Sequence, residues 1–193
     1  LAWIFQPKSQ LIFNIRQALH SLNQEKRTTR IAILFNALLS RVCTLVIHNS
    51  KLGIRHHEKV GFCPRNSLYV PNGFDVSKLS PSQAKRDSFR SLHEIPRQAR
   101  VITLLARYDP IKGHDVFLEG AKILLREKPE AIFLMVGEGL SPDHPKLSGL
   151  ISQIASNLIV LDHQDDVSSV LNGSDVLTVC SHSEGFPNAL GEA

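Results

Sequence analysis

Two glutamates near the end of the chain, Glu184 and Glu192, are separated by seven residues and flank an expected helix start. The apolar run at residues 175–179 predicts a buried strand before them. Pro187 suits the first helical position, because its missing N–H and its fixed φ cost nothing there. The free N–H groups of a helix start bind anions, usually phosphate. Carboxylates beside a phosphate are unfavourable unless they accept hydrogen bonds from hydroxyls, so the pattern indicates a sugar nucleotide.

Arg107 and Lys112 follow a second apolar run, at residues 101–106. A guanidinium donates a bidentate fork to phosphate oxygens and an ammonium adds a compact positive charge, so the pair suits a diphosphate. Other interpretations stay open for each residue alone. An Arg at a strand end is often a structural ion-pair partner, a Lys before Gly is commonly a surface charge, and Glu184 by itself is an ordinary solvated loop residue.

Two more apolar runs, at residues 131–136 and 158–161, are followed by short polar loops. The first loop begins Gly137-Glu138-Gly139, which is not the GxGxxG fingerprint and can be a simple tight turn. The second loop, residues 162–166, contains His163 and Gln164 and can simply cap a helix. Ligands of an open parallel sheet bind beyond the carboxyl ends of the strands. We therefore expect these loops, Arg107, Lys112 and Glu184 to share one edge.

The elements that position these residues alternate regularly along the second half of the chain. Helical patterns lie at residues 114–127, 146–155 and 166–171, between the expected strands. Apolar strands that alternate with helices at this spacing predict βαβ units and a parallel sheet covered on both faces. The fold class is therefore α/β.

The first part of the chain has a similar but weaker pattern. Its expected elements are a candidate strand at 2–5, a helix at 31–42, a strand at 43–47, a helix at 51–60 with Ser50 as N-cap, and a strand at 67–70. The polar, basic segment 22–30 is expected to be a solvated face, with contact to an acidic acceptor or to lipid headgroups as the alternative. We place a domain junction near residues 70–75, because residues 75–100 are polar and contain two prolines.

Composition narrows the class of protein. The net charge of +4 is mild, which favours anionic small substrates or a loose membrane association over nucleic-acid binding. The three cysteines are widely separated, which indicates a reduced, cytoplasmic compartment, with the inner face of the membrane as an open alternative. No stretch approaches the roughly 18 apolar residues of a membrane span. The nine histidines are scattered and there is no Asp-x-Asp, so we expect no metal.

Residues 70–193 resemble the nucleotide-binding half of the family 4 (group 1) retaining glycosyltransferases, which have the GT-B fold of two Rossmann-like domains with parallel sheets. Four motifs carry the resemblance in order: residues 70–75 (VPNGFD), Arg107 with Lys112-Gly113, residues 136–139 (VGEG), and the E-x7-E element from Glu184 to Glu192. One departure is mild, since Ala106-Arg107-Tyr108 replaces a frequent Gly-Arg-Leu and keeps the cation.

The resemblance implies a role for each matched residue. Arg107 and Lys112 would neutralise the leaving diphosphate, Glu184 would bind hydroxyls of the donor sugar, and Glu192 would accept the ribose diol. His163 and Gln164 would flank the nucleobase, and Gly137 would line the site. Further contacts to sugar and phosphate would come from the residues between the glutamates, namely Gly185, Phe186, Pro187, Asn188, Ala189 and Leu190.

We expect an enzyme that transfers a hexosyl unit from an NDP-sugar to a glycan or lipid-linked acceptor with retention, as in cell-surface polysaccharide biosynthesis, without a cofactor. A sugar-nucleotide epimerase on the same fold and a non-catalytic sugar-nucleotide-binding module are the alternatives. Residues 1–70 resemble the end of the first, acceptor-side domain, and residues 71–193 the donor domain. The chain starts without Met and stops inside an expected helix, so we expect an inactive fragment with both domains incomplete.

Overall fold

The computed structural model describes residues 10–17, 19 and 21–193, which form two compact units. Unit 1 comprises the described residues up to Gly73 together with Ser183–Phe186, and unit 2 comprises Phe74–His182 with Pro187–Ala193. The chain thus passes from unit 2 to unit 1 at Ser183, just before the E-x7-E element, and returns to unit 2 at Pro187 within it. The assignment of the two units to the two expected domains stays a prediction, and the candidate strand at residues 2–5 lies outside the described residues.

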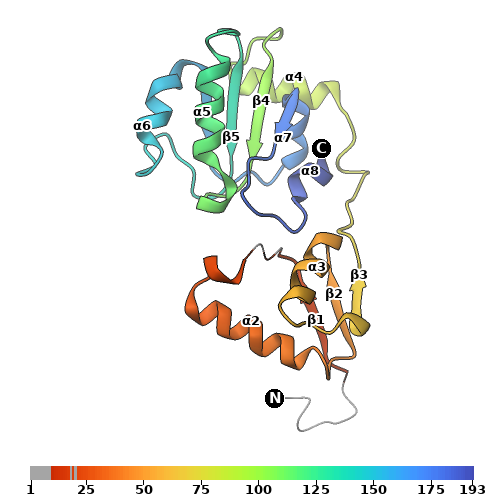
Figure 1. Cartoon of the computed structure of the whole chain (residues 1–193). Coiled ribbons are helices and arrows are strands. Elements are labelled where there is room, and N and C mark those ends of the chain that lie inside the picture. The colour runs from red at the N-terminus through yellow and green to blue at the C-terminus, as the bar shows by residue number, and fades with distance from the viewer. Residues whose placement is uncertain (1–9, 18, 20) are drawn as a thin grey trace. The chain divides into compact units, whose positions relative to one another are not determined.

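Unit 1 is built from two consecutive βαβ units (Figure 1). Its elements are β1 (Ile12–Ile15), a 3-10 helix (Leu22–Gln24), α2 (Arg27–Leu39), β2 (Leu45–His48), α3 (Lys51–Lys59), a 3-10 helix (Pro64–Asn66) and β3 (Ser67–Tyr69). The three strands are parallel in the order β1-β2-β3. Ser50 caps α3, because its hydroxyl accepts a hydrogen bond from the Gly53 N–H at 2.9 Å, as predicted.

The apolar residues that predicted α2 lie mostly on its exposed side. Ile31, Phe35 and Leu38 are 68%, 59% and 60% exposed. The helix instead buries its opposite side, where Ala37 packs with Val46 of β2 and Phe62 in the core of unit 1. The spacing therefore predicted the helix correctly, although it did not identify the face that packs on the sheet.

Unit 2 contains a four-stranded sheet with helices on both faces (Figure 1). Its elements are α4 (Gln83–Leu92), β4 (Val101–Leu105), a 3-10 helix (Pro110–Lys112), α5 (His114–Leu124), β5 (Ile132–Val136), α6 (Ser148–Ile151), a 3-10 helix (Ser152–Asn157), β6 (Leu158–Leu161), α7 (Val167–Gly173), β7 (Val176–Thr178) and α8 (Asn188–Glu192).

The sheet of unit 2 is entirely parallel, with the strand order β6-β5-β4-β7. Alternate residues of β5 face opposite layers: Phe133 and Met135 pack against α5 and α6, while Leu134 and Val136 pack against α4 and α7. Burial of both faces explains why these strands read as continuous apolar runs. Successive connections add β5 and β6 on one side of β4 and β7 on the other, as in Rossmann-like sheets. The predicted α/β class with parallel sheets is confirmed.

Three local predictions differ from the structure. Helix α4 lies within the polar stretch 75–100, where we expected no element. The helix expected at 146–155 is a single α-helical turn followed by a 3-10 segment with a kink at Ile154, whose φ is −131°. Pro187 precedes α8 as its N-cap in an extended conformation, with ψ at 110°, so the helix begins one residue later than predicted.

No helix among the described residues is both long and apolar enough to cross a membrane.

Candidate functional site

The loops after β4 and β7 meet at the point where the strand order of unit 2 reverses. The His182 N–H donates to the Ile111 carbonyl at 2.8 Å. Gly113 adopts a left-handed conformation with φ at 68°, and a Cβ there would collide with the Cys180 backbone. Open α/β sheets bind ligands at this topological switch point, because the diverging connections leave a crevice there. Arg107 and Lys112 lie in the loop on the β4 side.

The loops after β4 and β5 are also joined by backbone hydrogen bonds. The Ala106 N–H donates to the Val136 carbonyl at 2.9 Å, and the Tyr108 N–H donates to the Glu138 carbonyl at 2.8 Å. Gly137 is buried between them, so close to Ala106 that a Cβ would run into the Ala106 carbonyl group. The turn predicted at Gly137 therefore has a structural function, which is to bring the β4 loop against the β5 loop.

The loop after β6 lies next to the β5 loop at the same edge of the sheet. The Asp162 carboxylate accepts a hydrogen bond from the Gly139 N–H at 3.0 Å, which links it to the β5 loop. His163 is exposed and its Nε2 lies 3.2 Å from the Asp165 carboxylate, while the Gln164 amide donates to the Asp162 carbonyl. The alternative for this loop, that it caps a helix, is confirmed for Asp166, which accepts from the Ser169 N–H at the start of α7.

Arg107 is the exposed cation of this edge. Its side chain is 67% exposed and its Nη2 lies 3.8 Å from the Asp109 carboxylate, a long and solvated ion pair. Asp109 has a second role, because it accepts from the Ile111 N–H and caps the 3-10 helix that carries Lys112. The local ion pair proposed as the alternative for Arg107 is therefore present, yet it is weak enough for an incoming anion to compete with it.

Three ring side chains pack together at the β4 loop, namely Tyr108 of the loop itself with His114 and His144, and no role was predicted for them. His114 is 2% exposed, and its Nε2–H donates to the Ala106 carbonyl at 3.2 Å. Burial lowers the pKa of His114, so the ring is neutral near pH 7. The Tyr108 ring contacts the His144 ring in a tilted arrangement, with 3.9 Å between centroids and 47° between planes, and lies 5.6 Å from the His114 ring. The position of His114 directly after Lys112-Gly113 was the available signal.

The first half of the E-x7-E element lies in unit 1. Glu184, Gly185 and Phe186 are each partly buried there. An ideal Cβ on Gly185 would lie 2.5 Å from the Arg16 carbonyl oxygen and 2.9 Å from the Asn49 Oδ1. The backbone of this segment therefore packs directly on the loops that follow β1 and β2.

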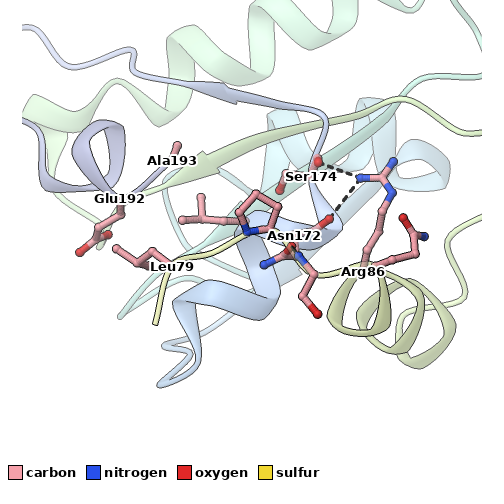
Figure 2. Close-up of a pocket in the computed structure, with 10 residues that line it drawn as sticks. Leu79, Arg86, Asn172, Ser174, Glu192 and Ala193 are labelled. Carbon is pink, nitrogen blue, oxygen red and sulfur yellow. Dashed lines mark hydrogen bonds between the residues drawn. The ribbon is translucent and has the colours of Figure 1, made fainter. Parts of the chain in front are cut away.

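The second half of the element, Pro187 to Glu192, belongs to unit 2 and includes α8. Asn188 and Leu190 are exposed, and Pro187 and Ala189 are partly buried. Glu192 lines a cavity of about 360 Å³ with residues around α4 and the α7–β7 junction (Figure 2). The described lining residues are Leu79, Pro81, Ser82, Gln83, Arg86, Leu171, Asn172, Ser174, Glu192 and Ala193.

The described residues that line the cavity at Glu192 do not come from the loops that follow β4, β5 and β6. Neither Arg107 nor Lys112 is among the described lining residues. Its one guanidinium, on Arg86, donates to the Asn172 and Ser174 carbonyls at 3.1 and 3.0 Å (Figure 2). The same guanidinium also donates to the Asp175 carboxylate at 2.6 Å. These partners neutralise and satisfy Arg86, so the cavity does not suit a diphosphate. The ribose role of Glu192 stays a prediction.

The described residues contain no cluster of three or more His, Cys, Asp or Glu side chains that could hold a metal ion. The expectation that the protein needs neither metal nor cofactor stays a prediction.

A match to a known protein family defines the class of protein to which the chain belongs. The family model of the group 1 glycosyl transferases matches residues 85–193, which is more than half of the chain. The chain belongs to this family.

Similar proteins extend the match beyond this region. The UDP-Gal:α-D-GlcNAc-diphosphoundecaprenol α-1,3-galactosyltransferase of Escherichia coli is 25% identical over 179 residues, which cover 88% of this chain and 45% of that enzyme. The crystal structure of Anabaena HepE in complex with UDP superimposes with a TM-score of 0.83 at 20% identity, over 98% of this chain and 52% of HepE.

The lipopolysaccharide glycosyltransferase WaaG gives a TM-score of 0.74 at 16% identity, over 100% of this chain and 58% of WaaG. These structures show that the chain covers part of the GT-B fold. The chain spans about half the length of these proteins.

Proposed function

We propose that the whole protein transfers a hexosyl unit from a nucleotide sugar to a glycan or lipid-linked acceptor, with retention of configuration and without a metal. The E. coli relative named above acts on a diphosphoundecaprenol-linked sugar, which supports an acceptor of this class. HepE was solved with UDP, which supports a nucleoside diphosphate as the leaving group. A lipid-linked acceptor would place the reaction on the cytoplasmic face of a membrane, in polysaccharide biosynthesis.

The observation that supports the donor site best is the switch point between β4 and β7. The β4 loop is held on three sides: to the β5 loop through Tyr108, to the β7 loop through His182, and to α5 through His114. These contacts hold the backbone that carries Arg107 and Lys112 at the carboxyl end of β4. Preorganised charges stabilise a developing anion without reorganisation at the moment of reaction.

The chemistry assigned to the residues follows their charges. As the glycosidic bond to the diphosphate breaks, the leaving group gains negative charge, which the Arg107 guanidinium and the Lys112 ammonium neutralise. Glu184 accepts hydrogen bonds from hydroxyls of the transferred sugar, and Glu192 accepts from the ribose diol. His163 and Gln164 lie beside the base, and backbone groups from Gly185 to Leu190 contact sugar and phosphate.

The test is a steady-state assay of the full-length protein with Arg107→Ala and Lys112→Ala. We expect kcat to fall by roughly 10²–10³ in each, the usual loss for one transition-state charge stabiliser. Lys122→Ala is the matched control, because Lys122 lies in the last turn of α5 and pairs there with Glu119 at 3.1 Å. Normal turnover in both variants would remove the diphosphate assignment. An acceptor-free control assay that yields an isomerised sugar would indicate an epimerase instead.

A further inference from the structure

The segment 183–186 is held by unit 1 although its neighbours on both sides belong to unit 2. It carries Glu184, which the proposed function assigns to the donor sugar. A carboxylate on a short connecting segment contributes to binding only when the segment is held at a defined position. The contacts that hold the segment therefore matter for the reaction.

Gly185 makes the closest of these contacts. Its ideal Cβ would lie 2.5 Å from the Arg16 carbonyl oxygen, 3.2 Å from the Arg16 carbonyl carbon and 2.9 Å from the Asn49 Oδ1. Separations below 3.0 Å essentially never occur for a real Cβ. Glycine is required here for close approach, since the backbone of the segment lies directly on one main-chain carbonyl and one side-chain amide.

Asn49 is fixed in place by its own backbone and by its side chain. It follows β2 directly, is 6% exposed, and its N–H donates to the Ile15 carbonyl at 3.4 Å. Its Nδ2 donates to the Arg16 carbonyl at 3.3 Å, which orients the side-chain oxygen toward Gly185. Ser50, the next residue, caps α3 and anchors the end of the strand.

We propose that Asn49 is a positioning residue for Glu184. Its side chain links the loop after β2 to the loop after β1 in unit 1. It also determines how closely the backbone of segment 183–186 packs on these two loops. The role in donor selection rests on the proposed function, whereas the support of the segment does not. A truncated Asn49 leaves the segment without the amide beneath Gly185, so Glu184 loses its fixed position within unit 1.

The experiment measures hydrogen exchange of the peptide that contains residues 183–186, and affinities for UDP and UDP-glucose, in the full-length protein. We expect Asn49→Ala to raise hydrogen exchange in this peptide and to weaken the binding of UDP-glucose about tenfold. The affinity for UDP should stay unchanged, because UDP lacks the sugar that Glu184 contacts. Gly185→Ala approaches the same contact from the other side and should also raise exchange in this peptide. Asn23→Ala is the control, since Asn23 is exposed and bonds to Arg30.

Unchanged exchange of residues 183–186 in both Asn49→Ala and Gly185→Ala overturns the proposal. Equal weakening of UDP and UDP-glucose also overturns it, because a general loss of unit 1 structure would produce that result. If the wild-type protein binds neither nucleotide, the donor assignment fails, and the exchange measurement still decides whether Asn49 supports the segment.

Discussion

At the scale of single residues, glycines determine how closely the loops of unit 2 approach each other. Gly137 lies against the Ala106 carbonyl and Gly113 against the Cys180 backbone, so both contacts exclude any side chain. The predicted motifs contained both glycines, but only as a turn and as a helix start. Their shared function is to bring the β5 and β7 loops against the loop that carries Arg107.

Gly137→Ala should lower the free energy of unfolding by about 1–3 kcal/mol, because the new methyl group collides with main-chain atoms that cannot move aside. The matched control is Gly120→Ala in the middle of α5, where nothing lies within 4 Å of the added methyl group. That variant should gain about 0.5–1 kcal/mol, since alanine favours helix over glycine. Urea unfolding of both variants measures the difference, and equal stabilities would contradict the close approach at Gly137.

At the scale of elements, a buried arginine attaches α4 to the sheet. Arg90 is 2% exposed, and it donates to the Asp175 carboxylate at 2.7 Å and to the Gly173 and Ala99 carbonyls. Asp175 also accepts from the Val101 N–H at 2.7 Å. Burial raises the pKa of Asp175, but the hydrogen bonds from Val101 and the two arginines of α4 outweigh it and leave the pKa below its usual value.

This arrangement explains why α4 was not predicted. Hydrophobic periodicity identifies a helix by its apolar stripe, and α4 buries one aromatic residue, Phe89, beside the charged Arg90. A buried Arg looks like a surface residue until its carboxylate partner, 85 positions further along the chain, is known.

Asp175→Asn should destabilise the chain by about 3–5 kcal/mol, because it leaves the Arg90 guanidinium buried without a counter-charge. Asp87→Asn is the control, since Asp87 accepts an exposed hydrogen bond from Gln83 and its loss should cost less than about 0.5 kcal/mol. The measurement is urea unfolding at pH 7. A loss for Asp175→Asn no larger than the control would show that the buried pair is dispensable.

At the scale of the whole molecule, buried histidines make stability depend on pH. Burial, with a smaller contribution from His57, lowers the pKa of His48 to about 4. His48 is 1% exposed, its ring lies 5.4 Å from the ring of His57, and neither of its nitrogens has a hydrogen-bond partner in the described structure. Burial also lowers the pKa of His57, His93 and His114.

Stability should therefore decrease as the pH falls. An unfolded histidine takes up a proton near pH 6.5, whereas folded His48 does so only near pH 4. Between these values the unfolded state binds more protons, so the stability that is present above pH 6.5 is lost progressively toward pH 4. His48 alone accounts for about 3 kcal/mol of this loss.

The measurement is urea unfolding at several pH values from 7.5 to 4.5 for the wild type and for His48→Phe, which keeps an aromatic ring but cannot bind a proton. The variant should show a shallower decrease of the free energy of unfolding. If the free energy of unfolding of both proteins fell equally with pH, groups other than His48 would cause the pH dependence.

The local sequence was sufficient to predict most of the elements and the order of the motifs. Strands buried on both faces are continuous apolar runs, so β4, β5, β6 and β7 were located to within one or two residues. Ser50 as an N-cap was equally readable, because capping depends on residues three positions apart. These features are determined by neighbours along the chain, and the sequence displays such neighbours directly.

Only the tertiary structure decided which loops meet. The order β6-β5-β4-β7 places the Arg107 loop at the switch point, and it brings together strands more than 70 residues apart. The contact of Gly185 with Asn49 and Arg16, and the pairing of Arg90 with Asp175, join positions that are even further apart in the sequence. Such contacts follow from how faces of sheets and helices pack, and no periodicity or spacing along the chain encodes them.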